Sequence, residues 1–331
     1  MWDPDLIFDT SKNYFTEHVG ERVLAPIWGG YKDMKEIPLS LSYLQEAKRA
    51  GMKITPLLHN DFDLQETKKL LHDSGAVQNL ARQITATALV YDFDGWNLDF
   101  ENMDEADKFL YTKFIKTVSE KLHMHGKEIS VDITVNSNSP NWSLCYDRKG
   151  MAAYVDYEVI MGYDQTPGGS RYSGPVSSYS WLKHHIAMLL KQVPNNKLVL
   201  GLPFYTRIWT GKEGQAASSV LMMKQIKSLL GQNNIGLFWN PEDRQYVGIW
   251  EENGQTRKVW FEERRSLQEK VSLAHDYKLA GLAFWRYGFE TEDIYNQIEG
   301  AFLNKKDESV RYKNRSEDIL IKFRERLKRA Q

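Results

Sequence analysis

An α/β fold, in which parallel strands alternate with helices, is the fold class that the sequence predicts. Short apolar runs rich in β-branched residues alternate with amphipathic stretches, which is typical of βαβ units whose strands are buried on both faces. The length of 331 residues suits one closed barrel with an insertion, and 42% hydrophobic with 26% charged residues is ordinary for a soluble globular protein. We therefore expect a TIM (β/α)8 barrel with a small α+β insertion between strands 7 and 8.

Seven strands of this barrel can be assigned from the apolar runs, beginning with VLAPIW at 23–28 and KITPLLH at 53–59. The other strands are expected over 95–101, 129–135, 157–163, 198–205 and 279–285. Helical periodicity predicts helices over 40–50, from residue 63 onward and over 74–91. An eighth strand, which would be the first of the barrel, has only a weak pattern near 2–8.

The interval between Tyr205 and Leu279 is far longer than one crossover helix requires. Within it, the runs 246–250 and 257–261 flank an Asn-Gly turn and predict a β-hairpin, and a helix is expected over 220–230. We therefore place an insertion subdomain at 206–262, between barrel segments 1–205 and 263–303. The last residues, 304–331, are dense in charge and predict a solvated terminal helix or tail.

Composition and missing motifs exclude several function classes. The formal net charge is −1, so no global field attracts nucleic acid or an anionic membrane. Cys145 is the single cysteine, which rules out an intramolecular disulfide. The sequence has no dinucleotide-binding, phosphate-loop or zinc-protease motif, and its paired histidines lack acidic partners at ligand spacing. We expect no cofactor, no metal, no nucleic-acid partner and no membrane span, and the oligomeric state stays open.

The segment DGWNLDFE, from Asp94 to Glu101, carries the strongest functional signal. Side chains alternate across a strand, so Asn97, Asp99 and Glu101 share one face while apolar residues share the other. Polar groups that face inward are costly in a core unless they serve a site. Glu101 ends the run, and catalytic residues of barrels lie at the carboxyl ends of strands. The alternative is a buried polar network that closes the barrel end.

DGWNLDFE resembles the D-G-x-[DN]-x-D-x-E signature on the fourth barrel strand of family 18 glycoside hydrolases. The likeness continues in MGYD at 161–164, GLPFYTRIW at 201–209 and GLAFW at 281–285, which resemble the motifs of the sixth, seventh and eighth strands. It covers roughly residues 20–303. Within the family, the stretches 155–164 and 203–209 are most similar to bacterial cell-wall and spore-cortex hydrolases of the N-acetylglucosaminidase type.

The resemblance implies retaining hydrolysis in which the 2-acetamido oxygen of the substrate attacks the anomeric carbon. Glu101 would be the general acid, with a pKa raised by partial burial and nearby carboxylates. Asp99 would orient the acetamido N–H and stabilise the positive charge of the oxazolinium, and Tyr163 would hydrogen-bond the acetamido carbonyl. Asp164 would contact a sugar hydroxyl or the neighbourhood of Glu101, and Trp285 would form the apolar floor under the sugar.

Further substrate-binding residues are expected around this set. Tyr205 and Arg207 lie where the family lines its cleft. Trp142 follows the fifth barrel strand and Trp28 ends an earlier one, so each could stack on a sugar ring. Asn97 stands where the fullest signature has Asp, and its amide can donate a hydrogen bond to the following aspartate and keep it ionised. The path of the proton after acid donation stays open.

We therefore predict a glycoside hydrolase that acts on N-acetylglucosamine-containing polysaccharide, with peptidoglycan or spore cortex as the expected polymer. One alternative is a chitinase, since chitin offers the same sugar. The other is a non-catalytic, lectin-like binder, although such members usually lack the acid that Glu101 supplies here. The substrate implies an extracellular location, at the wall or the spore. The chain starts without a signal peptide, so we expect additional upstream residues in the natural protein.

Overall fold

The computed structural model describes residues 22–34, 41–230, 235–291, 294–295 and 298. The chain divides into two compact units. The first comprises the residues up to Gly162 with Lys183–Gly201 and Asp276–Ala283, and the second comprises Tyr163–Leu182, Leu202–His275 and the residues from Phe284 onward. The strand expected near 2–8 and the tail expected at 304–331 lie outside the described residues.

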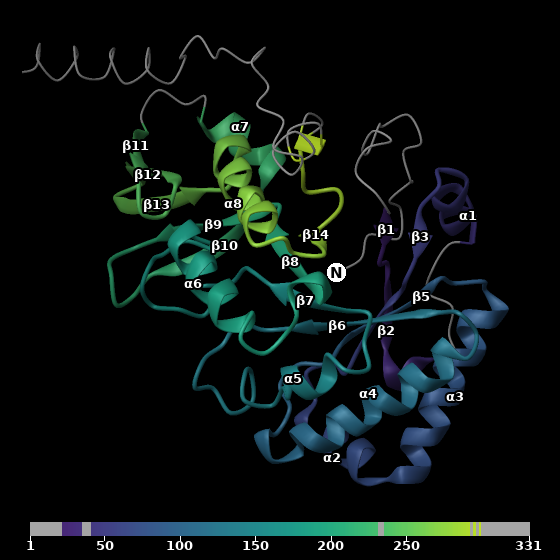
Figure 1. The fold of residues 1–331 in the computed structure, drawn as a ribbon. Helices are drawn as coiled ribbons and strands as arrows, with labels where there is room; N and C mark the ends of the chain where they lie inside the picture. Colours follow the sequence, from purple (N-terminus) through teal and green to yellow (C-terminus); the bar gives the residue numbers. More distant parts are fainter. Residues whose placement is uncertain (1–21, 35–40, 231–234, 292–293, 296–297, 299–331) are drawn as a thin grey trace, which may run out of the picture. The chain divides into compact units, whose positions relative to one another are not determined.

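A parallel sheet carries the strands that the sequence predicts (Figure 1). Its seven strands lie in the order β14-β8-β7-β6-β5-β4-β2, and neighbours from β2 to β8 pair in parallel. The strands are β2 (Ile27–Gly30), β4 (Leu57–His59), β5 (Gly95–Asp99), β6 (Glu128–Ile133), β7 (Tyr157–Met161), β8 (Leu198–Pro203) and β14 (Gly281–Trp285).

Two prolines interrupt the first strands of this sheet. β1 (Val23–Leu24) and β3 (Lys53–Ile54) pair in parallel as a separate ladder. Pro26 and Pro56 lie between these short strands and β2 and β4, and a proline has no N–H to donate to a ladder. The pairing continues nevertheless, because Thr55 N donates to Leu24 O and Leu57 N donates to Pro26 O. The predicted strands 23–28 and 53–59 are therefore each one interrupted strand.

Helices follow the strands along the chain. Asp73 separates two of them, because its carboxylate accepts hydrogen bonds from Gly75 N and Ala76 N and so caps the second. None of the described helices is both long and apolar enough to cross a membrane. The α-helices are α1 (Leu41–Arg49), α2 (Leu64–His72), α3 (Ser74–Val90), α4 (Lys108–His123), α5 (Arg148–Met151), α6 (Tyr179–Leu189), α7 (Met223–Leu230) and α8 (Arg264–Asp276), and Tyr31–Asp33, Glu105–Asp107 and Asn195–Lys197 are 3-10 helices.

The apolar side of β5 packs on helix α3, and helices α3 and α4 contact each other and α2 (Figure 1). Phe100, which follows β5, stacks on Tyr111 and Phe114 of α4. Trp96 is fully buried, and its Nε1 donates to Ile84 O of α3 at 2.9 Å. This packing fixes which face of the strand is left for polar side chains.

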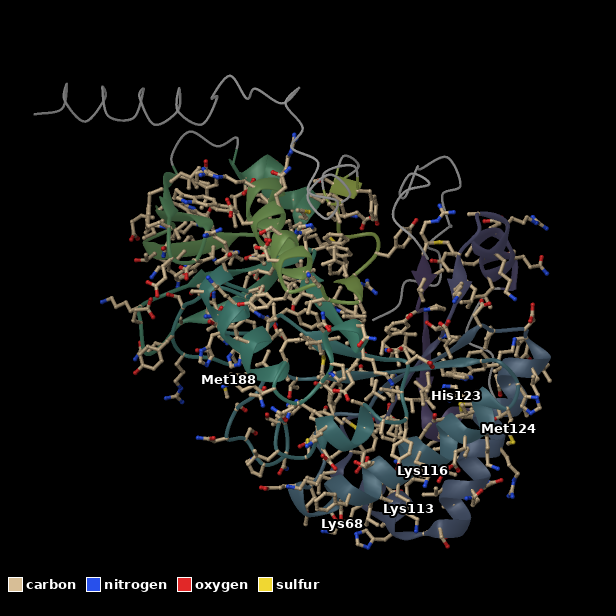
Figure 2. All side chains as sticks on the ribbon, viewed as in Figure 1. Lys68, Lys113, Lys116, His123, Met124 and Met188 are labelled. Atoms are coloured by element: carbon tan, nitrogen blue, oxygen red, sulfur yellow. The ribbon has the colours of Figure 1, made fainter. Side chains whose placement is uncertain are left out.

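The opposite sides of these helices are charged, as Figure 2 shows. Lys68 projects from α2, and Lys113, Lys116 and His123 follow one another along α4. The Nζ atom of Lys68 lies 2.8 Å from Asp104 Oδ2. The helices are therefore amphipathic, which is why their periodicity predicts them.

The second unit contains an antiparallel sheet in the order β10-β9-β13-β12-β11. A cluster of Trp209, Ala216, Val247 and Trp260 is buried in this unit. The strands are β9 (Tyr205–Thr210), β10 (Ala217–Met222), β11 (Gly236–Asn240), β12 (Gln245–Glu252) and β13 (Gln255–Phe261). β12 and β13 form the predicted hairpin.

The predicted fold class is confirmed, with local differences in the insertion. Residues 220–222 end strand β10, whereas a helix was expected from 220, and α7 begins only at Met223. β10 alternates poorly and is half exposed, so its sequence lacks a strand signal. β8 ends at Pro203, and Tyr205 already belongs to the antiparallel sheet. The subdomain bounds 206–262 stay a prediction.

Candidate active site

The polar residues of β5 lie on the face opposite to the helices, as predicted. Ser130 Oγ of β6 donates to Asn97 Oδ1 at 2.6 Å, and Asn97 Nδ2 donates to Asp132 Oδ2 at 2.8 Å. The register places Asn97 opposite Ser130, and side chains alternate, so Asp99 shares this face with Asp132. Glu101 follows two positions after Asp99, just beyond the end of the strand.

The backbone of Glu101 is held by an amide side chain from the neighbouring strand end. Asn60 follows β4 and is 1% exposed. Its Oδ1 accepts from Glu101 N at 3.0 Å, and its Nδ2 donates to Glu101 O at 2.7 Å and to Thr67 Oγ1 at 2.9 Å. One residue earlier, Tyr146 OH donates to Phe100 O at 2.8 Å. The carboxyl side chain therefore starts from a backbone that is fixed on both sides.

Burial dominates the electrostatics around Asp99. It raises the pKa of Asp99 to about 7, and Asp99 Oδ1 is buried with no hydrogen-bond partner among the described residues. Burial also raises the pKa of Asp132 well above its usual value, as do the charges of Asp99 and Glu101, while the hydrogen bond from Asn97 acts against them. Two buried carboxylates that interact this strongly do not both ionise near neutral pH. The pair is therefore harder to ionise than two free aspartates.

The expectation that Asn97 donates to Asp99 and keeps it ionised is wrong. The Asn97 amide donates to Asp132 instead, and Asp99 is left with a raised pKa. Sequence analysis missed Asp132, although one acidic residue inside the apolar run ISVDITV is the same signal that marks Asp99. Asn60, which was also missed, has no such signal, because an amide after a strand end is common in loops.

A second group of predicted residues lies in the second unit. Tyr205 OH donates to Asp164 Oδ1 at 2.9 Å, and Arg207 Nη2 lies 3.2 Å from the same oxygen. The rings of Tyr163 and Tyr205 meet edge to face, with 6.3 Å between centroids. The Arg207 guanidinium packs on Gly168, where an added Cβ would lie 2.6 Å from Nη1. The contacts with Tyr205 and Arg207 hold the Asp164 carboxylate in place. The Asp164 side chain is 45% exposed, so a ligand can still reach it.

Trp142 is the exposed member of the predicted tryptophans, at 42%. Its ring lies 6.0 Å from that of Phe62, a residue that sequence analysis did not single out and that is 53% exposed. Asn102 Nδ2 donates to Phe62 O at 2.8 Å and so ties the loops after β4 and β5 together. Each of these exposed rings offers an apolar face on which a sugar could stack. Trp285 ends β14 and is partly buried, and its carbonyl accepts from Phe204 N at 2.7 Å.

The position of Trp28 contradicts its predicted stacking role. Trp28 is 3% exposed, and its indole ring packs edge-on against Phe93 and Trp96, with centroids 5.7 and 5.5 Å away. Tyr91 adds a third ring at 5.9 Å. A ring enclosed by other rings has no free face for a sugar, so Trp28 is a core residue.

The arrangement of the first group suits acid catalysis. Glu101 is a carboxyl group on a fixed backbone, and Asp99 offers a buried acceptor oxygen on the same face of the strand. Burial raises the pKa of the Cys145 thiol to about 11, which disfavours the nucleophilic thiolate. In the part of the chain that the structure describes, no three His, Cys, Asp or Glu side chains gather as a metal site would require.

Comparisons with known proteins agree with this chemistry. The family model described as glycosyl hydrolases family 18 matches residues 40–290. YvbX, an uncharacterized glycosylase of Bacillus subtilis (strain 168), is 26% identical over 77% of this chain and 76% of its own length. The cortical fragment-lytic enzyme of the same organism is 26% identical over 76% of this chain, but the match spans only 61% of that enzyme.

Among solved structures, a chitinase from Chromobacterium violaceum ATCC 12472 has the same fold, with a TM-score of 0.73 at 21% identity. The match covers 79% of this chain and 83% of that chain. The family model spans most of the described residues, including both groups of candidate site residues. The chain therefore belongs to family 18 of the glycosyl hydrolases.

Proposed function

We propose that this protein is a retaining hydrolase that cleaves polysaccharide at N-acetylglucosamine units, with Glu101 as the general acid. The observation that carries the proposal is the pairing of two features at the carboxyl end of β5. Asn60 fixes the backbone of Glu101, and Asp99 Oδ1 is a buried acceptor without a partner. A substrate amide N–H would satisfy that acceptor, and an N-acetyl sugar brings such an amide.

The reaction proceeds in two steps. In the first, the acetamido oxygen bonds to the anomeric carbon, the glycosidic bond breaks, and Glu101 gives its proton to the departing oxygen. Asp99 accepts from the acetamido N–H and, when ionised, stabilises the positive charge of the oxazolinium. In the second step, water adds to the anomeric carbon, Glu101 takes a proton from it, and the acetamido group is restored. The configuration inverts twice, so it is retained.

Tyr163 and Asp164 belong to the MGYD stretch that resembles the sixth-strand motif of the family, and this resemblance supports their proposed role in sugar binding. The role that the resemblance implies for Tyr163 is to donate a hydrogen bond to the acetamido carbonyl of the substrate. Asp164, held by Tyr205 and Arg207, accepts from a sugar hydroxyl. Burial and the Asp164 charge raise the pKa of Tyr205 above its usual value, so its hydroxyl remains a donor at all working pH values.

Aromatic residues supply the apolar contacts. Trp285 forms the floor under the sugar at the cleavage point. Trp142 and Phe62, exposed and adjacent, stack on a further sugar ring.

Peptidoglycan, in particular that of the spore cortex, is the proposed polymer. The named activity of the cortical fragment-lytic relative supports this choice. Chitin is the second candidate, because the chemistry of Glu101 and Asp99 uses only the acetamido sugar that both polymers contain. Either polymer lies outside the cytoplasm, so the protein acts extracellularly, at the wall or the spore.

Product analysis on purified spore cortex, vegetative peptidoglycan and N-acetylglucosamine oligomers, side by side, tests this proposal. We expect new reducing N-acetylglucosamine ends from peptidoglycan, and about 10²–10⁴-fold fewer with the Glu101→Gln variant as matched control. Cleavage of the oligomers alone would favour the chitinase alternative. If the wild type and the Glu101→Gln variant bind these glycans equally well and neither releases product, the protein is a lectin-like binder instead.

A further inference from the structure

Asp132 is a buried carboxylate beside the proposed active site that the two-step reaction above does not use. It is 8% exposed and lies on β6, on the face that carries Asn97 and Asp99 of the adjacent strand. Its Oδ2 accepts from Asn97 Nδ2 at 2.8 Å, and the carboxyl groups of Asp99 and Glu101 both act to raise its pKa. The other acidic residue of β6, Glu128, has a cation 2.6 Å away, whereas Asp132 has acidic neighbours.

The orientation of Asn97 is fixed by Ser130. Ser130 Oγ donates to Asn97 Oδ1, so the NH₂ group of the amide must point to Asp132. Asp132 Oδ2 is thereby held as an acceptor, and a proton on Asp132 must reside on Oδ1. Asn97 thus presents Asp132 in one orientation to the site.

We propose that Asp132 is a positioning residue of the hydrolytic site, which shares one proton with Asp99 and takes it when Asp99 must carry a full negative charge. This inference rests on the proposed function. It supplies the second carboxylate that Asn97 does not provide on β5, from the neighbouring strand.

The proton and charge balance closes without an outside donor. Before the reaction, Asp99 and Asp132 together hold one proton and one negative charge. As the acetamido oxygen attacks, the shared proton passes to Asp132, and the negative charge on Asp99 faces the oxazolinium. Glu101 gives its own proton to the leaving oxygen and regains one from water in the second step. The shared proton then redistributes between the two aspartates.

The ionisable groups that share this face come from the three neighbouring strands. β5 contributes Asp99, followed by Glu101, β4 contributes His59 in register with Asp99, and β7 contributes Tyr157 in register with Ser130. A negative charge at Asp132 makes it harder to ionise the other two carboxyl groups. Replacing Asp132 by a neutral side chain should therefore lower the pKa values of Asp99 and Glu101.

The test is the pH profile of kcat/KM for cleavage of the N-acetylglucosamine tetramer by the full chain. For Asp132→Asn, we expect the acid and the alkaline limb of this profile to move to lower pH by about one unit. At a fixed pH on the alkaline limb, kcat/KM should therefore be about tenfold lower than in the wild type. The double variant Asn97→Asp/Asp132→Asn moves the carboxylate to β5 and keeps the volume, so both limbs should return toward those of the wild type.

Glu158→Gln is the matched control. Glu158 is fully buried on β7, and the register puts it on the face away from Asp132. Its removal should leave the profile in place. An unchanged profile in Asp132→Asn, an equal shift in Glu158→Gln, or no recovery in the double variant would each overturn the inference. If the wild type cleaves no substrate, the proposed function itself fails, a result distinct from these.

Discussion

Asn60 offers the sharpest perturbation of the site, because it touches Glu101 only through the backbone. Asn60→Ala removes the two hydrogen bonds to Glu101 N and O and a third to Thr67 Oγ1. At about 1 kcal/mol for each bond, unfolding should become easier by about 3 kcal/mol. At about 2.1 cal/mol/K of unfolding entropy per residue, a chain of 331 residues should then lose roughly 4 °C in melting temperature. Misplacing an acid by about 1 Å can cost on the order of 100-fold in rate, so we expect kcat to fall by about that factor.

Asn60→Asp separates packing from hydrogen bonding. The introduced carboxyl group has the same shape and still accepts from Glu101 N, but in its ionised form it repels Glu101 O at the 2.7 Å contact. Activity relative to the wild type should therefore be lowest at neutral pH and recover toward acid pH, where the new group is protonated.

Steady-state cleavage of N-acetylglucosamine oligomers and thermal unfolding by circular dichroism measure these effects. Asn195→Ala is the control, since that exposed amide donates to Lys278 O at 2.9 Å, outside the candidate site. It should change neither kcat nor, by more than about 1 kcal/mol, stability. The reasoning is refuted if Asn60→Ala turns over substrate as fast as the wild type while folded.

Three further predictions concern other parts of the chain. Glu101→Gln keeps the shape of the acid but has no acidic proton, so cleavage of natural oligomers should fall by about 10²–10⁴-fold while calorimetric sugar binding persists; comparable kcat would contradict the role. Gly168→Ala should push Arg207 from Asp164 and raise KM by about fivefold, for the loss of about 1 kcal/mol, with little change in kcat. Gly169→Ala, where an added Cβ meets nothing within 4 Å, should have no effect on KM; equal KM values in the two variants would exclude the proposed contact. Burial raises the pKa of Glu158 to about 8 from 4.5, so the native state binds a proton that the unfolded chain releases, and this group's contribution to stability falls as pH rises between those values. The pH dependence of the melting temperature should lack this contribution in Glu158→Gln. An identical pH dependence in the variant and the wild type would contradict the assignment.

Local patterns in the sequence predict the fold and half of the site. The face shared by Asn97, Asp99 and Glu101 follows from the two-residue period of one strand, which needs no knowledge of its neighbours. The role of Asp132 depends on the register between β5 and β6, and strand sequences alone do not fix a register. For the same reason the hydrogen bond of Asn97 was assigned to the wrong aspartate.

The errors elsewhere have similar causes. Trp28 lies near the end of a predicted strand, but whether its ring points toward the helices depends on the alternation after the interruption at Pro26. β10 is a half-exposed strand of mixed composition. Its apolar residues are equally compatible with the first turn of the helix that follows, so the sequence pattern does not separate the two elements. Asn60 is positioned by tertiary contacts alone, between the end of β4 and the residue after β5.

Retention of configuration, with the acetamido group as nucleophile, is the central claim of the mechanism. Proton NMR of the wild-type protein acting on N-acetylglucosamine oligomers, recorded within the first minutes, distinguishes the anomer that forms first from the one produced by later mutarotation. We predict that the β-anomer of the new reducing end appears first and that a thiazoline analogue of the cyclised acetamido group inhibits its formation. Initial release of the α-anomer would contradict the account, because water would then have displaced the leaving group directly.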